Sequence, residues 1–256
     1  MPETRLHGYS PFTIACLHGG PGAPGSVRTL AEALGTTDGV LEPFQSADTI
    51  GGLIEELKGQ LEAQAQLPVV LIGHSWGAWL GFLFAAKFPK LVKKLILVGS
   101  GPFEESYLQR ITRTRLERLG PEGKGLFKKM LEGTLKDGDL ARIGVLLSKT
   151  DSFDRLPDPP GEKNPEPDEA QYGPIWKEAE ELRRSGKLLE AGKAIRCPVV
   201  AIHGDWDPHP AEGVQKPLRG LLKDFRFILL RDCGHEPWME KKAKDAFLKA
   251  IRAELS

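Results

Sequence analysis

The chain has 256 residues, of which 40% are hydrophobic, so it can bury one sizeable core. Its 35 lysine and arginine residues balance 35 aspartate and glutamate residues, and no net field draws the protein toward nucleic acid or an anionic membrane. This balance argues against both of those partners and favours a small-molecule or short-peptide ligand.

The beginning of the chain carries no pattern of a signal peptide or membrane span. Its apolar stretch FTIACL is short, and His18 and two glycines follow it at once. The three cysteines, Cys16, Cys197 and Cys233, are an odd and sparse set that is typical of reduced thiols rather than of a disulfide framework. We therefore expect a soluble, cytoplasmic protein.

Short apolar runs alternate with longer amphipathic segments along most of the chain. Strands are predicted over 12–17, 68–72, 94–99, 198–204 and 225–230, and the less regular run DGVLEPF allows one more over 38–44. Helices are predicted over 26–35, 48–66, 76–88, 210–222 and 237–254. Continuous apolar strands alternating with helices indicate a parallel, doubly wound sheet covered on both faces. The predicted class is α/β.

Residues 101–196 interrupt this alternation. They contain charged helical segments such as YLQRITRTRLERL, and six prolines fall between positions 157 and 174, a density that favours extended or mobile loop. We expect this segment to be a helical lid inserted into an α/β core formed by residues 1–100 and 197–256.

Ser75 lies at the end of a predicted strand, in the sequence G-H-S-W-G. Ligands of doubly wound sheets bind beyond the carboxyl ends of the strands, and G-x-S-x-G is the pattern of a nucleophile elbow. Gly73 and Gly77 suit this reading because larger side chains would collide with the backbone of so sharp a turn. A serine that only caps the following helix is the structural alternative.

A nucleophilic serine needs a base and a carboxylate that orients the base. The strand 198–204 is followed by Asp205 and Asp207, and the strand 225–230 is followed by Gly234 and His235. This order, serine then acid then histidine, is that of the α/β-hydrolases. Asp207 fits the H-G-x-x-D spacing better than Asp205, although either could be a turn or capping residue. Cys233, two residues from His235, is expected to be a buried inert thiol.

The segment CLHGGPGAPG, residues 16–25, follows the first predicted strand. Such a turn could be purely structural, or its backbone N–H groups could face Ser75 and supply part of an oxyanion hole.

Together these motifs resemble the α/β-hydrolase superfamily over residues 12–254, and H-G-G-P-G with S-W-G looks like its prolyl aminopeptidase branch. The resemblance implies the N–H groups of Gly20 and Trp76 as oxyanion donors. It also implies that His18 and His203 hold loops through hydrogen bonds, whereas it assigns no role to His74 or His209.

The chain departs from that branch in three places. Only about a dozen residues precede the first predicted strand, so we expect a sheet shortened at its N-terminal part. The stretch LEPFQSADTIGG replaces the Asp-x-Arg-Gly-type sequence of the family. Glu104 and Glu105 could hold the ammonium group of a peptide substrate, but they equally suit the negatively charged first turn of a helix.

The leading functional hypothesis is a serine hydrolase that needs no cofactor or metal. Ser75 would attack a carbonyl, with His235 as the base and Asp207 as its orienting acid. Esters or amides of small apolar acids are the expected substrates, including peptides with N-terminal proline. Trp206 and Trp238 flank the acid and the base, and they predict an apolar or aromatic pocket.

Two other functions remain open from the sequence. His203, Asp205, Asp207 and His209 form a dense set of nitrogen and oxygen ligands that could hold a metal, although this leaves Ser75 without a role. A non-catalytic protein could also use the same fold to bind a ligand in the pocket and a partner at the lid.

Overall fold

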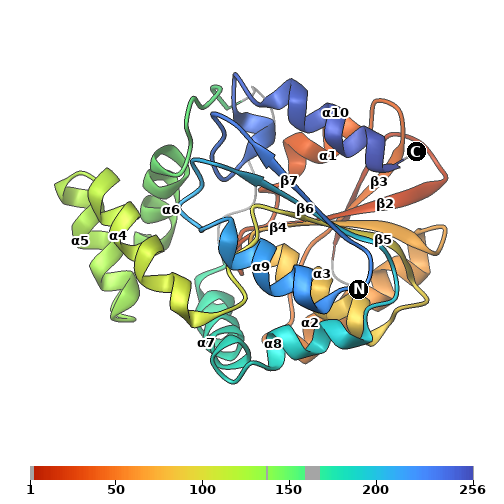
Figure 1. Ribbon diagram of the computed structural model, residues 1–256, viewed down its shortest axis with the longest axis horizontal. Helices are drawn as coiled ribbons and strands as arrows, with labels where there is room; N and C mark the ends of the chain where they lie inside the picture. The colour runs from red at the N-terminus through yellow and green to blue at the C-terminus, as the bar shows by residue number, and fades with distance from the viewer. Residues whose placement is uncertain (1–2, 137, 159–167, 256) are drawn as a thin grey trace.

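The computed structural model describes residues 3–136, 138–158 and 168–255. A seven-stranded sheet with the order β1-β3-β2-β4-β5-β6-β7 crosses the middle of the molecule (Figure 1). The strand β1 pairs antiparallel with β3, and all other neighbours are parallel. The predicted α/β fold is therefore confirmed.

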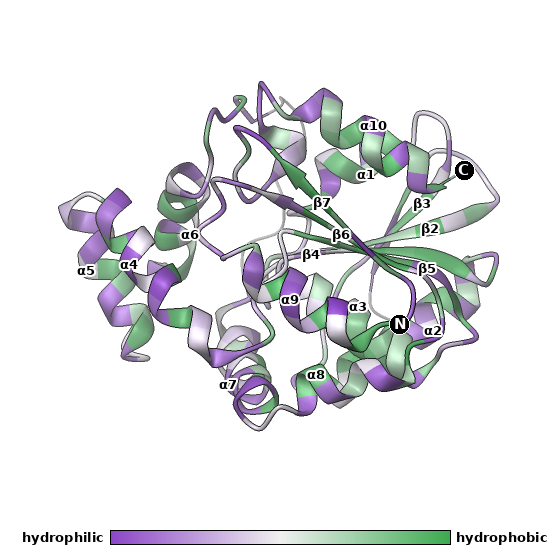
Figure 2. Ribbon diagram, viewed as in Figure 1, coloured by the Kyte–Doolittle hydropathy of each residue, from purple (hydrophilic) through white to green (hydrophobic). Residues whose placement is uncertain are grey.

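The strands are short and mostly buried, as their apolar sequences predict. Their bounds are β1 Thr4–His7, β2 Phe12–Leu17, β3 Gly39–Pro43, β4 Val69–His74, β5 Val92–Val98, β6 Val199–Gly204 and β7 Phe225–Leu230. Every residue of β3, β4 and β6 is buried, which explains why β4 and β6 begin with continuous apolar runs rather than alternating ones. The hydropathy colouring in Figure 2 shows the same concentration of hydrophobic residues in the sheet.

Helices cover both faces of this sheet. One face carries α1 (Arg28–Leu34) and α10 (Lys244–Leu255), which bury Leu30, Leu34, Phe247 and Ile251 against it. The opposite face carries α2 (Ile50–Gln64), α3 (Trp76–Lys87), α8 (Lys187–Ala191) and α9 (Glu212–Leu221). Figure 1 shows the two layers above and below the strands, as a doubly wound sheet requires.

Two parts of the chain differ from the predicted elements. The strand β1 is not among the predicted strands, and within residues 3–11 it is the one strand ahead of β2. The predicted helix over 237–254 is divided into a 3₁₀ turn, η3 (Pro237–Met239), and α10. Glu240, fully buried between them, uses its carboxylate to accept backbone N–H groups.

The chain between β5 and β6 packs as two parts. The cap, our name for α4 (Leu108–Arg118), α5 (Pro121–Leu131) and α6 (Asp139–Thr150), has a small apolar cluster of its own around Leu119, Phe127 and Ile143. It projects from the sheet at the left of Figure 1. In contrast, α7 (Glu169–Arg184) and α8 join the main core through Ile175 and Leu188.

The proline-rich part of the predicted lid falls largely outside the described residues, because it includes 159–167. Among the helices of the described ranges, none combines the length and the apolar character needed to cross a membrane.

Candidate active site

Ser75 lies in a sharp turn between β4 and α3. Its backbone has φ 54° and ψ −116°, a left-handed conformation that costs a non-glycine residue free energy. Ser75 N–H donates to the Val98 carbonyl oxygen at 3.0 Å, which ties the turn to the end of the neighbouring strand β5. The turn is therefore held in place by the sheet on which it sits.

Two glycines make this turn sterically possible. A Cβ atom at Gly73 would lie 2.2 Å from the carbonyl oxygen of Gly77. A Cβ atom at Gly77 would lie 2.5 Å from the Leu17 carbonyl oxygen and 2.6 Å from that of His18. Larger residues at either position would push backbone against backbone, as expected from the elbow pattern.

The loop after β6 brings Asp207 to the loop after β7, which carries His235. His235 Nδ1 lies 2.8 Å from Asp207 Oδ2, and the Asp207 side chain has no exposed surface. Asp205, two residues earlier, instead accepts from Cys233 N–H at 3.4 Å and lies 3.5 Å from Arg231. The structure thus places Asp207, and not Asp205, against the imidazole.

Burial and charge set the protonation of this pair. Burial disfavours the charge on Asp207, but His235, His209 and His203 outweigh that cost, so the pKa of its carboxyl lies well below its usual value. Burial likewise works against protonated His235, yet the charge and hydrogen bond of Asp207 raise its pKa above the ordinary 6.5. Asp207 is therefore a carboxylate that accepts the His235 Nδ1–H, leaving the lone pair on Nε2.

The Ser75 hydroxyl makes no hydrogen bond to any residue in the described ranges, and neither does His235 Nε2. Catalytic hydrogen bonds are often long or misaligned in unliganded enzymes and shorten when substrate binds. Both atoms are thus available to a substrate and to each other.

The loop of residues 18–22 approaches Ser75 at Gly19. A Cβ atom at Gly19 would lie 3.4 Å from Ser75 Cβ, and the Gly19 N–H is taken up by Ser26 Oγ at 3.2 Å. The N–H groups of Gly20 and Trp76 have no acceptor among the described residues, and Trp76 opens α3, whose N-terminus favours negative charge. Their predicted use as oxyanion donors stays a prediction.

A side chain that the sequence pattern does not mark connects these two loops. Gln45, just after β3, accepts from Trp76 Nε1 at 2.8 Å and donates to the His18 carbonyl oxygen at 3.5 Å. Gln45 belongs to the stretch that replaces the family's usual sequence, so no motif could have identified it.

The remaining histidines surround the Asp207–His235 pair. His74 donates from Nε2 to the His235 carbonyl oxygen at 3.0 Å, and its ring lies 4.7 Å from the His235 ring between centroids. The His209 ring lies 4.6 Å from the His235 ring and hydrogen-bonds to Asp207. His18 and His203 donate to the carbonyl oxygens of Gly19 and His209, which are the loop-holding roles implied by the resemblance.

The loop of His235 is fixed by residues at the end of the cap. His235 N–H donates to the carbonyl oxygen of Asp151 at 3.0 Å, and the Asp151 carboxylate pairs with Arg115 of α4 at 2.6 Å. Buried Glu240 accepts from Gly234 N–H and Phe153 N–H, both at 2.9 Å. One carboxylate therefore joins the histidine loop to the chain that leaves α6.

The two tryptophans predicted near the substrate have different surroundings. Trp206 is 40% exposed and packs against the Phe153 ring and under the Arg118 guanidinium, which lies 4.1 Å from its ring centroid. Trp238 is 2% exposed and lies in the core, with its ring at right angles to His74. Trp238 thus packs against His74 inside the core instead of presenting a surface to a ligand.

Glu104 and Glu105 are exposed at the start of η1 (Glu105–Tyr107), just before α4. Glu105 lies close enough to Arg183 and Arg184 of α7 to favour their charged forms. The proposed hold on a substrate ammonium group stays a prediction for both glutamates. Cys233 is buried, and burial raises the pKa of its thiol, as expected for an inert cysteine.

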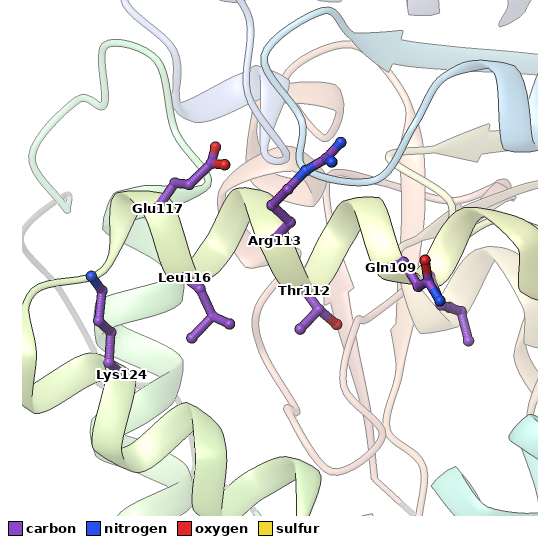
Figure 3. Close-up of a pocket in the computed structure, with 7 residues that line it drawn as sticks. Gln109, Thr112, Arg113, Leu116, Glu117 and Lys124 are labelled. Carbon is purple, nitrogen blue, oxygen red and sulfur yellow. The ribbon is translucent and has the colours of Figure 1, made fainter.

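A cavity of about 540 Å³ lies on the cap rather than at Ser75. It is lined by Leu108, Gln109, Thr112, Arg113, Leu116, Glu117 and Lys124. Figure 3 shows these side chains distributed around α4, with Lys124 reaching in from α5. None of these residues belongs to the loops that carry Ser75, Asp207 or His235, so this cavity is separate from the candidate active site.

One group in the described part of the chain has the composition of a metal site. Candidate ligand atoms of Asp207, His209 and His235 lie within 4.8 Å of one another, whereas Asp205 and His203 are not in the group. Both imidazole Nδ1 atoms already contact the carboxylate directly, at 2.7 and 2.8 Å. These distances are those of hydrogen bonds between the three residues.

Comparison with known proteins agrees with this fold. The sequence profile described as "alpha/beta hydrolase fold" matches residues 7–242, which is most of the chain. The protein belongs to the α/β-hydrolase family. This α/β-hydrolase is 25% identical over 283 aligned residues to the 2-hydroxy-6-oxononadienedioate/2-hydroxy-6-oxononatrienedioate hydrolase of Escherichia coli, with 96% of this chain and 89% of the relative covered.

Solved structures show the same fold at lower identity. VinJ superposes with a TM-score of 0.71 at 19% identity, covering 98% of this chain and 93% of the other. The proline iminopeptidase of Mycobacterium smegmatis superposes with a TM-score of 0.63 at 16% identity, covering 98% and 93%. The family and its hydrolase members establish that this α/β-hydrolase is an enzyme that catalyses hydrolysis.

Proposed function

We propose that this α/β-hydrolase is a serine hydrolase that cleaves esters or amides of small apolar acids through an acyl-enzyme intermediate. The observation that carries the proposal is the 2.8 Å hydrogen bond from His235 to buried Asp207, beside a serine held at φ 54°. A capping serine would not need this strained turn, and a loop histidine would not need a buried carboxylate behind it.

The proposed reaction begins when His235 Nε2 takes the proton of Ser75 and the serine oxygen attacks the substrate carbonyl. Asp207 keeps the imidazole in the tautomer with hydrogen on Nδ1 and stabilises the imidazolium that forms. The N–H groups of Gly20 and Trp76 would stabilise the oxyanion. His235 then protonates the leaving group, and water activated by the same imidazole releases the acid.

The substrate class is a small molecule or a short peptide. Peptides with N-terminal proline are a specific case, for which Glu104 and Glu105 would hold the ammonium group. Charge-neutral substitutions at both glutamates would then raise KM for free-amine substrates and leave simple esters unaffected. Three free cysteines support a cytoplasmic location for this activity.

Labelling with a fluorophosphonate probe tests the proposal directly, because only an activated serine reacts with it. Wild-type protein should be labelled, and Ser75→Ala should lose all labelling while keeping its thermal unfolding midpoint. Ser100→Ala is a matched control, since Ser100 is a buried serine near the neighbouring strand end whose hydroxyl donates to the Gly101 carbonyl oxygen. Labelling of Ser75→Ala at the wild-type level would overturn the assignment.

A substrate screen follows on wild-type protein that has not been treated with the probe. It should include simple esters, proline amides and a 2-hydroxy-6-oxo dienedioate, the type of compound named for the Escherichia coli relative. Turnover that a chelator abolishes would favour metal-dependent hydrolysis. Stoichiometric binding without labelling or turnover would favour a non-catalytic binding protein.

A further inference from the structure

His209 is bonded to the carboxylate oxygen that His235 does not use. Asp207 Oδ1 lies 2.7 Å from His209 Nδ1 and 2.9 Å from the His209 backbone N, whereas Oδ2 faces His235. Each oxygen of this buried carboxylate is thus hydrogen-bonded to a different histidine ring. A carboxylate with both oxygens anchored cannot rotate about χ2 without breaking a hydrogen bond.

The position of His209 is itself fixed. Its carbonyl oxygen accepts from His203 Nε2 at 2.8 Å, and His203 lies on β6, which leads into the Asp207 loop. Its ring also contacts the His235 ring, with centroids 4.6 Å apart and planes tilted by 34°. His209 therefore lies between the sheet, the acid and the imidazole.

Hydrogen placement on His209 follows from its partner. Because Asp207 Oδ1 can only accept, Nδ1 of His209 must carry the hydrogen. Burial lowers the pKa of His209 to about 4 despite the opposing charge of Asp207, so the ring is neutral at neutral pH. A neutral donor strengthens the hold on the carboxylate without adding a positive charge that would repel the imidazolium form of His235.

We infer that His209 is a positioning residue that keeps the carboxylate of Asp207 aligned with His235, through the Nδ1–H to Oδ1 hydrogen bond. The inference rests on the proposed serine hydrolase function. His209 would then be a fourth side chain of the site, after the serine, the acid and the base, and it would act on the reaction only through the acid.

Three variants separate the hydrogen bond from the shape of the ring. In His209→Asn the amide nitrogen takes the place of Nδ1 and can still donate. In His209→Gln the amide nitrogen takes the place of Nε2 and points away from Asp207. In His209→Phe the ring stays against His235 but the donor is lost. All three keep the backbone N–H that also reaches Asp207 Oδ1.

The expected result is a loss in kcat of about tenfold for His209→Gln and His209→Phe, because each lacks one charge-assisted hydrogen bond. Their KM for a small ester should stay within about twofold of wild type, since a residue that acts only through the acid changes the chemical step and not substrate binding. His209→Asn should keep kcat within about threefold of wild type. Wild-type kcat in all three variants, or an equal loss in all three, would overturn the inference.

Titration of His235 by NMR gives a second readout that needs no turnover. The other groups that act on His235, namely Asp207, Asp151, Arg115 and His74, are unchanged in these variants. If Asp207 loses its alignment, the raised pKa of His235 should move down toward 6.5 in His209→Gln and His209→Phe, but not in His209→Asn. A His235 titration that is identical in all variants would contradict the positioning role.

This design separates the inference from the proposed function. Failure of the function appears in wild type as absent probe labelling and absent ester turnover. Failure of the inference appears as equal behaviour of the asparagine, glutamine and phenylalanine variants, and the His235 titration reports it even in a protein without turnover.

Discussion

Two glycines beside the candidate active site, Gly204 and Gly234, and two on the surface of the cap, Gly125 and Gly144, meet opposite surroundings. A Cβ atom at Gly204 or Gly234 would lie 2.1 or 2.2 Å from a backbone carbonyl oxygen. At Gly125 and Gly144 of the cap, a Cβ atom would meet nothing within 4 Å. The same residue type is thus a steric requirement at the candidate active site and a matter of conformational freedom in the cap.

This difference shows that backbone positions are tightly constrained at the candidate active site and loosely constrained in the cap. The loops after β4, β6 and β7 pack backbone against backbone, so the positions of Ser75, Asp207 and His235 are set by the sheet. The cap has a small apolar cluster and exposed residues such as Leu131 and Val145. Substitutions should therefore have large effects on one region and small, sometimes favourable, effects on the other.

The largest effect is expected at the two aspartates after β6. Asp207→Asn should lower kcat by about 10⁴-fold, because the imidazole would lose its orienting carboxylate and its correct tautomer. Asp205→Asn should change kcat by less than about threefold, since Asp205 contacts Cys233 and Arg231 instead. Steady-state kinetics on one ester compares them, and a larger loss in Asp205→Asn would show that the acid is misassigned.

A smaller but still severe effect is expected from Gly77→Ala in the first turn of α3. Alanine normally favours a helix, yet here its methyl group would collide with the carbonyl oxygens of Leu17 and His18. The free energy of unfolding should fall by about 3 kcal/mol, measured by urea denaturation. A variant as stable as wild type would mean that the elbow has more room than the structure shows.

The smallest effect is expected from a glycine-to-alanine substitution in the cap. Gly144→Ala lies in the middle of α6, on an exposed position with open space around it. It should raise the free energy of unfolding by about 0.5–1 kcal/mol, because alanine loses less conformational entropy in a helix than glycine does. Kinetic parameters should not change, and a destabilised variant would remove the contrast with Gly77→Ala.

Much of the fold could be predicted because its signals are local. Continuous apolar runs predict five of the seven strands, and the less regular run DGVLEPF predicts a sixth, Gly39–Pro43. The serine, aspartate and histidine stood at strand ends, and parallel strands bring their carboxyl ends to one edge of a sheet. The strand-end positions of Asp207 and His235 therefore predict that the two side chains lie close together, and their atoms Oδ2 and Nδ1 are 2.8 Å apart.

The rest depended on contacts between distant segments. The strand β1 has only four residues, and it forms because Thr4–His7 pairs with Val40–Pro43. The helix predicted from 237 is interrupted because the carboxylate of Glu240 bonds the backbone of Gly234 and Phe153. The contact of His209 with Asp207 reflects loop geometry that no periodicity encodes.

The bonds from Asp151 and Glu240 to the histidine loop have a consequence for protein engineering. A chimera in which residues 151–154 were exchanged together with the cap would lose the chain that holds the Gly234–His235 backbone. The natural boundary for such an exchange lies before Asp151, so that residues 151–154 travel with the core and not with the transplanted helices.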